Sequence, residues 1–292
     1  MDLLSIDNLT DDQIGRILDR STELLALSGQ TIGGLEGKIV FNLFYENSTR
    51  TAMSFATATH RLGASAISLS VEHSSVKKGE TLADTARTLN AMRPDVLVIR
   101  HRENGAAAEV ALIVDAPVIN AGDGTNEHPT QALLDAATLR HRLGRIEGLK
   151  VAICGDIKHS RVARSNAKLL QRLAADVRLA GPPELMPDGI PALSVDDAIE
   201  GADVVMMLRI QRERLEADLG DGPGEYLQRY GLTAERLARA APGAVVMHPG
   251  PMNRGVEIED SIADDPRRSL ITLQVEMGVA ARMACLEMLV GS

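Results

Sequence analysis

The sequence predicts an α/β protein of two domains, each a mostly parallel sheet flanked by helices. Apolar runs of strand length alternate with helical patterns along the chain, and this alternation begins a second time after Gly148. The length of 292 residues also favours two domains over one. We expect one domain over residues 1–142 and another over 143–272, with a C-terminal helix, 273–292, that packs back on the first domain.

The first series of elements begins with an amphipathic helix over 8–29, for which Thr10 or Asn8 is a suitable N-cap. Strands are predicted at 38–44, 65–69, 96–100 and 117–120. The intervening helices are predicted at 52–62, 81–90, 106–113 and 129–141. Such regular alternation indicates a parallel sheet covered by helices.

The second series has strands at 150–156, 177–180, 202–208 and 244–247. Helices are predicted at 162–173, at 194–200 with Ser194 as the cap, at 232–239, and at 273–290. Gly155-Asp156 ends the first of these strands, as in many dinucleotide sites. No Gly-x-Gly-x-x-Gly follows, which argues against a nicotinamide cofactor.

Composition excludes several classes of function. The formal charge of −9 argues against nucleic acid or an anionic membrane as the main partner. Cys154 and Cys285 lie far apart in apolar runs and form neither a metal-ligand spacing nor a disulfide framework, so we expect a cytoplasmic protein without a metal or other cofactor. No run reaches transmembrane length, and the N-terminus lacks the features of a signal peptide.

The first candidate site is Ser48-Thr49-Arg50-Thr51, between a predicted strand and a predicted helix. Backbone N–H groups at the start of a helix lack partners within the helix and attract anions. The guanidinium of Arg50 matches phosphate or carboxylate in shape. An alternative is that Ser48 or Thr49 merely caps the helix.

Other polar stretches also follow predicted strands, at the edge where open parallel sheets bind ligands. Arg100 directly follows an apolar strand. Arg102 is interpreted as a side chain that marks the point where the chain leaves the strand for solvent. His128 and Gln131 share one side of a helix's first turn and can hydrogen-bond a carbonyl or amide. The stretch 73–81, with Ser74, Ser75 and two lysines, is either a mobile loop that delivers positive charge or a solvated surface loop.

In the second domain, Arg161 and Arg209 each follow a strand. Two separate arginines suit a dicarboxylate, because each can bind one carboxylate through two N–H groups. His248-Pro249-Gly250-Pro251 is a rigid loop that either presents backbone carbonyls to a ligand or is a plain turn.

Taken together, these stretches resemble the catalytic chains of aspartate carbamoyltransferases over essentially the whole length. The resemblance is carried by six motifs that occur in the family's order and spacing: Ser48-Thr49-Arg50-Thr51, Lys78-Gly79-Glu80-Thr81, His128-Pro129-Thr130-Gln131, Gly155-Asp156-Ile157-Lys158 with Arg161, Arg209-Ile210-Gln211, and His248-Pro249-Gly250-Pro251. The family makes carbamoyl aspartate and phosphate from carbamoyl phosphate and L-aspartate in pyrimidine synthesis.

The resemblance implies a role for each site residue. Those that would bind carbamoyl phosphate are Ser48, Thr49, Arg50, Thr51, Ser74, Lys78, Arg100, His128, Gln131, Pro249 and Gly250. Of these, Arg50, Thr51, Lys78, Arg100 and His128 would also be catalytic, with Arg50 stabilising the departing phosphate and Thr51, Arg100 and His128 polarising the carbamoyl oxygen. Aspartate would be bound by Lys78, Arg161, Arg209 and Gln211. Gly250 stands where some members carry Leu, a change that a backbone carbonyl role tolerates.

The resemblance further implies a homotrimer in which Ser74 and Lys78 reach the site of a neighbouring subunit. Counting back from Lys78 favours Ser74 over Ser75. Some family members assemble with separate regulatory chains and others with dihydroorotase. The residue types present suggest direct attack of the aspartate amine, without a covalent enzyme intermediate.

Two other functions stay open at this point. An ornithine carbamoyltransferase would bind a substrate with one carboxylate and a cationic side chain, so a second arginine such as Arg209 favours aspartate. A non-catalytic scaffold of the same fold would be expected to have lost at least one charged site residue. This chain retains Arg50, Lys78, Arg100, His128, Arg161 and Arg209.

Overall fold

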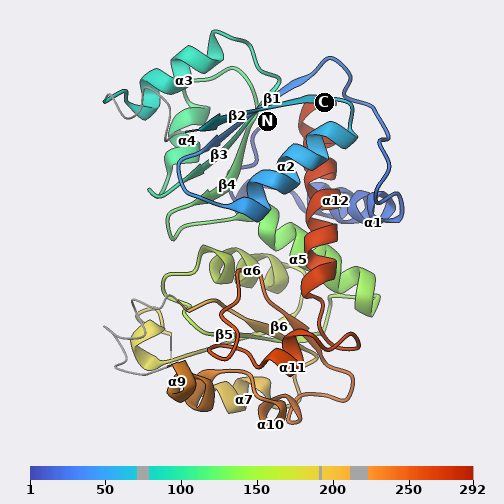
Figure 1. Cartoon of the computed structure of the whole chain (residues 1–292), viewed down its shortest axis with the longest axis vertical. Helices are drawn as coiled ribbons and strands as arrows, with labels where there is room; N and C mark the ends of the chain where they lie inside the picture. Colours follow the sequence, from blue (N-terminus) through green and yellow to red (C-terminus); the bar gives the residue numbers. More distant parts are fainter. Residues whose placement is uncertain (71–78, 191–192, 211–222, 292) are drawn as a thin grey trace. The chain divides into compact units, whose positions relative to one another are not determined.

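The computed structural model describes residues 1–70, 79–190, 193–210 and 223–291 (Figure 1). The chain forms two compact units. Unit 1 comprises Met1–Ala137 and Val275–Ser292, and unit 2 comprises Thr138–Gln274. The division falls within two helices, α5 (Pro129–Leu143) and α12 (Ile271–Val290), so each of these contributes residues to both units.

Unit 1 contains a four-stranded sheet in the order β2-β1-β3-β4, and every pairing is parallel. The strands are β1 (Ile39–Phe44), β2 (Ser65–Ser70), β3 (Val96–His101) and β4 (Val118–Asp123). Residues of β1, β3 and β4 are buried along most of their length, as expected for strands with helices on both faces. All four predicted strands of this region are therefore confirmed.

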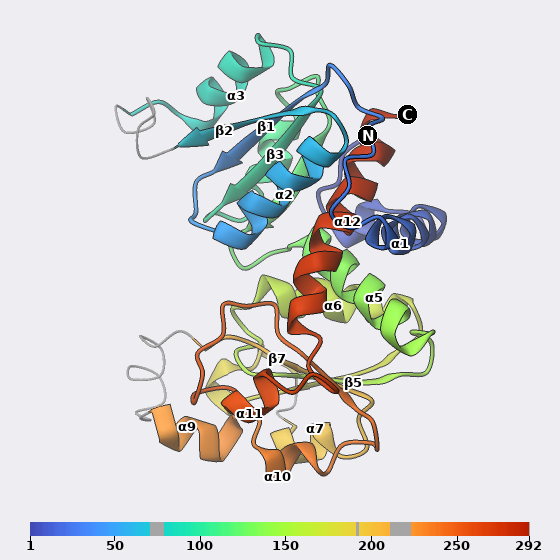
Figure 2. The same ribbon diagram turned by 45° about the vertical axis from the view of Figure 1, so that its right-hand side comes forward.

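Helices cover both faces of this sheet. They are α1 (Asp11–Ala26), α2 (Thr49–Arg61), α3 (Leu82–Asn90), α4 (Ala106–Ala111) and the unit 1 parts of α5 and α12. Ala86 of α3 and Val110 of α4 pack on Phe41, Leu43 and other apolar side chains of one face. Figures 1 and 2 show α2 on the opposite face.

The C-terminal helix α12 packs on unit 1, as the sequence predicted. The guanidinium of Arg282 lies 5.1 Å from the centre of the Phe55 ring on α2. Arg20 on α1 forms an ion pair with Glu287, in which Nε lies 2.7 Å from Oε2. These contacts fix both α1 and α2 against the last helix of the chain.

Unit 2 repeats the same strand order with its own four strands, β6-β5-β7-β8, again all parallel. They are β5 (Lys150–Cys154), β6 (Asp176–Ala180), β7 (Val204–Met207) and β8 (Val245–Met247). The helices are α6 (Arg161–Arg172), α7 (Val195–Ile199), α9 (Pro223–Tyr230), α10 (Ala234–Leu237) and α11 (Asp260–Ala263). Side chains of α7, α10 and α11 share one apolar cluster with β5, β7 and β8.

Several element boundaries differ from the predictions. α2 begins at Thr49, not at 52, because its first turn is polar and shows no apolar periodicity. The predicted helix 232–239 is only α10, capped by Thr233. α9 and α11 were not predicted, and neither were the short 3₁₀ helices Ile6–Asn8 and Pro183–Leu185. The predicted caps Thr10 and Ser194 are confirmed, since each accepts a backbone N–H three residues on.

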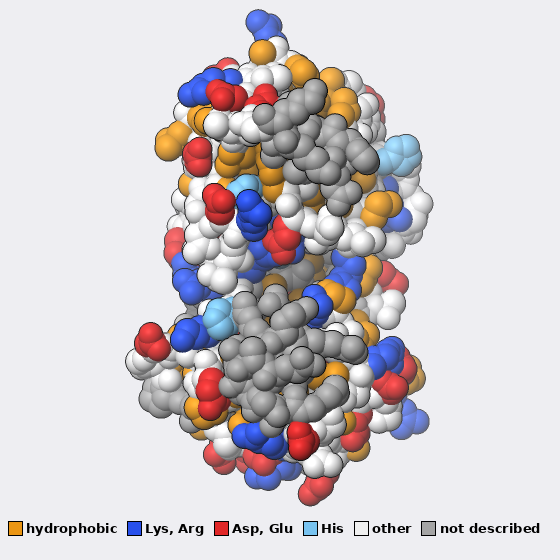
Figure 3. All heavy atoms as spheres, turned by 60° about the vertical axis from the view of Figure 1, so that its left-hand side comes forward, with side chains coloured by type: hydrophobic (Ala, Val, Ile, Leu, Met, Phe, Trp, Pro, Cys, Tyr) orange, Lys and Arg blue, Asp and Glu red, His pale blue; other side chains and the backbone are white. Residues whose placement is uncertain are grey.

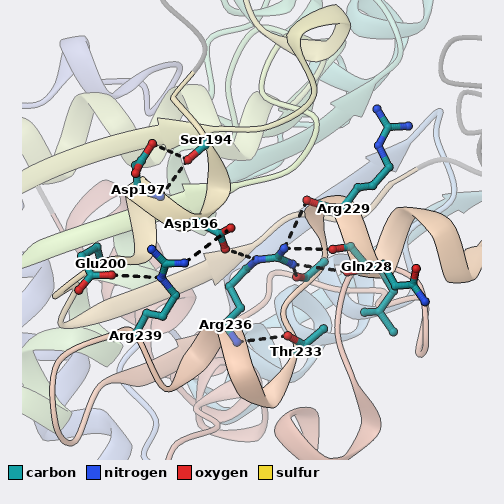
Figure 4. A network of polar contacts seen from close by, with 11 residues as sticks. Ser194, Asp196, Asp197, Glu200, Gln228, Arg229, Thr233, Arg236 and Arg239 are labelled. Carbon is teal, nitrogen blue, oxygen red and sulfur yellow. Dashed lines mark hydrogen bonds and ion pairs between the residues drawn. The ribbon is translucent and has the colours of Figure 1, made fainter.

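Arg236 connects three helices of unit 2 (Figure 4). Its Nε donates to Asp196 Oδ1 on α7 at 2.6 Å, and its Nη2 donates to the carbonyl of Gln228 in the last turn of α9 at 3.1 Å. Its Nη1 donates to the carbonyl of Gly231 just beyond α9. A cation at the end of a helix satisfies carbonyls that have no partner within the helix. Arg236 therefore holds α9 on α7 and α10.

The net negative charge is not gathered in one patch on the face drawn in Figure 3, where acidic and basic side chains alternate. Within the part of the chain that the structure describes, no helix has the length and apolar character needed to cross a membrane. The same described residues contain no group of three His, Cys, Asp or Glu side chains arranged to hold a metal ion.

Candidate active site

The carboxyl ends of β1, β3 and β4 bring the predicted site residues of unit 1 to one edge of the sheet. Strand β3 lies between β1 and β4 in that sheet. Ser48 to Thr51 follow β1, Arg100 is the fifth residue of β3, and His128 and Gln131 follow β4. This is the edge at which parallel sheets of α/β proteins bind ligands.

Ser48 occupies the N-cap of α2, but its side chain makes no capping hydrogen bond. Ser48 is thus at the cap position that the alternative interpretation gave it, but without the hydrogen bond by which a side chain caps a helix. Thr49 and Arg50 begin α2 and are exposed, while Thr51 is buried. The first turn of a 13-residue helix thus carries a hydroxyl, a guanidinium and backbone N–H groups, a combination suited to an anion.

Arg100 reaches across this edge from β3. Its Nη2 donates to Glu46 Oε1 at 3.1 Å, and its Nη1 donates to the carbonyl of Ala121 on β4 at 3.4 Å. The side chain is 11% exposed. By contrast the side chain of Arg102 is 81% exposed, which confirms its interpretation as an exit to solvent. Arg100 is therefore aimed along the sheet edge, and Glu46, which the sequence analysis overlooked, orients it.

His128 and Gln131 lie at the start of α5 and are buried. The turn that precedes them is built on the buried carboxylate of Asp123, which accepts hydrogen bonds from the backbone of Gly105 at 2.7 Å and Glu127 at 3.1 Å. The Nε2 of Gln131 donates to Asp135 Oδ1 at 3.0 Å. Asp135 was not predicted, although an aspartate within the apolar run 132–137 is an unusual signal.

In unit 2, Arg161 and Arg209 follow the adjacent strands β5 and β7. Arg161 is the first residue of α6, whose cap Ser160 accepts the N–H of Ala163 at 3.1 Å. Arg209 is exposed, two residues past β7. The turn after β5 passes close to β7: Gly155 has φ +130°, and a Cβ there would lie 3.1 Å from Leu208. Only glycine fits this approach without strain.

The loop 248–253 after β8 is fixed by a buried glutamate. Nε2 of His248 lies 3.2 Å from Glu257 Oε1, and Nδ1 of His248 accepts the N–H of Gly250 at 2.8 Å. Because Nδ1 accepts, the ring hydrogen is on Nε2 and faces the carboxylate. Asn253 N also donates to Glu257. The backbone of Pro249 and Gly250 is thus held between two anchored residues, and Glu257 was another residue that the sequence analysis missed.

The two cysteines do not offer a nucleophile. Both are free and buried. Burial raises the pKa of the Cys154 thiol and of the Cys285 thiol to about 12, so both stay protonated at neutral pH. Ser74, Lys78 and Gln211, which the resemblance places in the site, lie outside the described residues.

Comparison with known families agrees with this geometry. Residues 1–141 match the model of the aspartate/ornithine carbamoyltransferase carbamoyl-P binding domain, and residues 147–289 match that of the Asp/Orn binding domain. The chain belongs to the aspartate/ornithine carbamoyltransferase family. An aspartate carbamoyltransferase catalytic subunit of Rhizorhabdus wittichii is 57% identical, over 98% of this chain and 94% of that protein. A catalytic subunit of Granulibacter bethesdensis is likewise 57% identical, with the same coverage.

Solved structures of the family share the fold. Aspartate transcarbamoylase of Trypanosoma cruzi, in complex with N-(phosphonacetyl)-L-aspartic acid, superposes with a TM-score of 0.87 at 33% identity, over 98% of this chain and 94% of that one. An ornithine carbamoyltransferase of Pyrococcus furiosus superposes with a TM-score of 0.88 at 29% identity, over 100% and 97%. The fold is therefore common to both branches of the family and does not distinguish their substrates.

Proposed function

We propose that this chain transfers the carbamoyl group of carbamoyl phosphate to the amine of L-aspartate, giving N-carbamoyl-L-aspartate and phosphate in pyrimidine synthesis. The observation that carries this proposal is the set of cationic, hydroxyl and imidazole side chains at one edge of the unit 1 sheet, in a chain 57% identical to aspartate carbamoyltransferase catalytic subunits. Fold alone would fit an ornithine enzyme equally well.

Residues 1–142 with 273–292 are proposed to bind carbamoyl phosphate. The phosphate would lie at the first turn of α2, against Ser48, Thr49, Arg50 and Thr51, where N–H groups and a guanidinium favour negative charge. Arg100 and His128, with Thr51, would donate to the carbamoyl oxygen. The Gln131 side chain, and the carbonyls of Pro249 and Gly250, would accept from the carbamoyl NH₂.

Residues 143–272 are proposed to bind aspartate. Arg161 at the start of α6 and Arg209 beyond β7 would each bind one carboxylate, with Gln211 and Lys78 as further contacts. Ornithine carries a cation where aspartate carries its second carboxylate, so an arginine at that position would repel it. This charge argument favours aspartate as the substrate.

The reaction would proceed by direct attack. The neutral amine of aspartate adds to the carbamoyl carbon, negative charge develops on the carbamoyl oxygen, and phosphate then leaves. Donors aimed at that oxygen stabilise the charge, and removal of one such donor typically costs about 3 kcal/mol of transition-state stabilisation. The departing phosphate is a suitable proton acceptor for the amine.

The test is phosphate release from carbamoyl phosphate by the purified chain, with L-aspartate and L-ornithine offered separately. We expect release with aspartate only. Arg102→Ala, which alters an exposed arginine next to the site, should behave like the unchanged chain, whereas Arg100→Ala should not. Release with ornithine would move the chain to the other branch of the family, and no release with either amine would support a non-catalytic scaffold.

We further propose that the active protein is a cytoplasmic homotrimer in which Ser74 and Lys78 act on a neighbouring subunit. The free, buried state of Cys154 and Cys285 fits a reducing compartment. Mixing two inactive variants, Lys78→Ala and Arg50→Ala, should restore some activity, because some sites in a hybrid trimer receive both intact residues. Hybrid trimers seen by native mass spectrometry but without activity would indicate that each site is built from one chain.

A further inference from the structure

Asp135 is a buried carboxylate one helical turn beyond Gln131. Its residue is 0% exposed, and Oδ1 accepts a hydrogen bond from Gln131 Nε2 at 3.0 Å. Residues four apart on a helix face the same side. On exposed helices such pairs add little to stability. Here the pair is buried within unit 1, beside residues proposed to bind carbamoyl phosphate. The direction of the Gln131 amide therefore decides which of its two ends can face the ligand.

The carboxylate determines which way the amide of Gln131 points. An ionised carboxylate can only accept hydrogen bonds, so the NH₂ end of the amide must face Asp135. The carbonyl oxygen Oε1 then points away from Asp135. The hydrogen bond between these two side chains uses Nε2 and leaves Oε1 out. Gln131 therefore presents an acceptor, and not a donor, to a ligand.

A positive side chain from α12 balances the buried charge of Asp135. Arg282 is 3% exposed, and its Nη1 donates to the carbonyl of Gly278 at 3.0 Å. Burial lowers the pKa of Arg282 to about 10, and the charge of Asp135 opposes that shift. Arg282 thus stays charged at neutral pH. The opposite charge of Arg282 favours the ionised form of the Asp135 carboxyl, and in that form the carboxyl keeps the amide of Gln131 in one orientation.

We propose that Asp135 is a positioning residue that fixes the amide of Gln131 so that Oε1 accepts a hydrogen bond from the NH₂ of the carbamoyl group. This inference rests on the proposed function, in which Gln131 contacts that NH₂. In this arrangement Gln131 touches the ligand, and Asp135 acts on the ligand through Gln131. The fixed Oε1 then favours the carbamoyl NH₂ over a group that cannot donate a hydrogen bond.

Acetyl phosphate separates this role from a purely structural one. It carries a methyl group where carbamoyl phosphate carries NH₂, so it cannot donate to Oε1, yet it has the same phosphate and carbonyl. A variant that merely loosens α5 should weaken the binding of both compounds equally. A variant that frees the amide of Gln131 should weaken carbamoyl phosphate alone.

The experiment uses the full chain with the Asp135→Asn change. Asn presents either an oxygen or an NH₂ group, so the amide of Gln131 loses its fixed direction. We expect the KM for carbamoyl phosphate to rise about tenfold, the effect of one hydrogen bond, while the inhibition constant of acetyl phosphate stays within about twofold. Thr130→Val, which removes a buried hydroxyl that makes no hydrogen bond to the described residues, should change neither constant. Equal rises in both constants, or no rise in either, would overturn the proposal.

Two further variants keep the result interpretable. Gln131→Met removes the acceptor, and an unchanged preference for carbamoyl phosphate over acetyl phosphate there would contradict the proposed function itself. A lowered preference in Gln131→Met together with an unchanged one in Asp135→Asn would overturn only the role of Asp135. If Asp135→Asn fails to fold, the exchange Gln131→Glu with Asp135→Asn restores one amide and one carboxylate. That exchange should retain part of the preference for carbamoyl phosphate, and complete loss would count against the proposal.

Discussion

The two sheets share one strand order, yet the edges that carry the proposed site residues are built differently. In unit 1 the side chains lie on strand ends and first helical turns, and buried carboxylates stand behind them: Asp123 under the turn before His128, and Asp135 behind Gln131. In unit 2 a buried carboxylate, that of Glu257, likewise holds the loop after β8, but Arg209 beyond β7 is exposed. Strand order decides which loops meet, whereas buried polar partners decide how firmly each side chain is held.

This difference suits the two proposed ligands. Carbamoyl phosphate contains the bond that breaks, so donors around it must be in place before charge develops. Aspartate needs to be bound through two carboxylates, and an exposed arginine such as Arg209 can bind one of them after the substrate arrives. Substitutions in unit 1 should therefore mainly change turnover, and those in unit 2 mainly the affinity for aspartate.

The largest effect is expected for Arg50→Ala. Loss of the guanidinium at the start of α2 removes stabilisation of the departing phosphate, and kcat should fall by about a thousandfold, the upper range for one charge-stabilising donor. The measurement is steady-state phosphate release with both substrates saturating, and Arg102→Ala serves as the control. Near-normal turnover in Arg50→Ala would show that the first turn of α2 is not part of the active site.

Arg209→Ala tests the other unit. Hydrogen bonds to charged groups contribute about 1.5–3 kcal/mol, so the KM for aspartate should rise by about ten- to a hundredfold while kcat changes less. Arg239→Ala is the matched control, because Arg239 is an exposed arginine of unit 2 that pairs with Glu200. If Arg209→Ala lowers kcat as strongly as Arg50→Ala does and leaves the KM unchanged, the proposed contrast between the units is wrong.

Arg236→Ala tests how unit 2 holds α9. The change removes a partly buried ion pair and several hydrogen bonds to the end of that helix, and should cost about 2 kcal/mol of local stability. Hydrogen exchange of the α9 amides measures this loss directly. The exposed pair Arg239–Glu200 should contribute less than about 1 kcal/mol. Unchanged exchange in α9 would mean that apolar contacts alone hold it.

The smallest effect concerns Asp95, which joins two elements of unit 1. Burial raises the pKa of its carboxyl, but hydrogen bonds from Ile39 N and Lys38 outweigh burial, so the pKa lies below its ordinary value. Such a group stabilises the fold above its unfolded pKa of about 3.9, and this stability is lost as the pH falls through the folded value. Asp95→Asn should cost about 1 kcal/mol at pH 7.

Urea unfolding at a series of pH values checks this sign. The difference in unfolding free energy between the unchanged chain and Asp95→Asn should be constant above about pH 5 and shrink below about pH 4. A difference that grows on acidification would show that the carboxyl is destabilising in its charged form.

Much of the fold could be predicted because the inner strands of both sheets are largely apolar runs, as in Val96 to Ile99, bounded by polar or glycine residues. Short helices could not. α9 begins with Pro-Gly, which is typical of a turn, and it is held by Arg236 from a later helix, a contact that no local pattern reveals. α11 has only four residues, too few for a helical period.

The residues of the candidate site likewise include some that could be predicted from the sequence and some that could not. Residues that follow strands, such as Arg100 and His128, were predictable because their place in the chain indicates a sheet edge. Their supporting partners Glu46, Asp135 and Glu257 were not, because their roles depend on contacts that only the folded chain creates. A charged residue inside an apolar run, as with Asp135 and Arg282, is the one local signal of such a partner.

The scarcity of aromatic residues provides a built-in optical probe. The chain has no tryptophan and only three tyrosines. Tyr45 lies in unit 1, its ring 4.9 Å from that of His101 next to Arg100, while Tyr226 and Tyr230 lie 5.5 Å apart in unit 2. Tyr45→Phe would make the tyrosine fluorescence report on unit 2 alone, and the double change Tyr226→Phe with Tyr230→Phe would make it report on unit 1 alone. The unfolding of each half of the molecule could then be followed without any attached label.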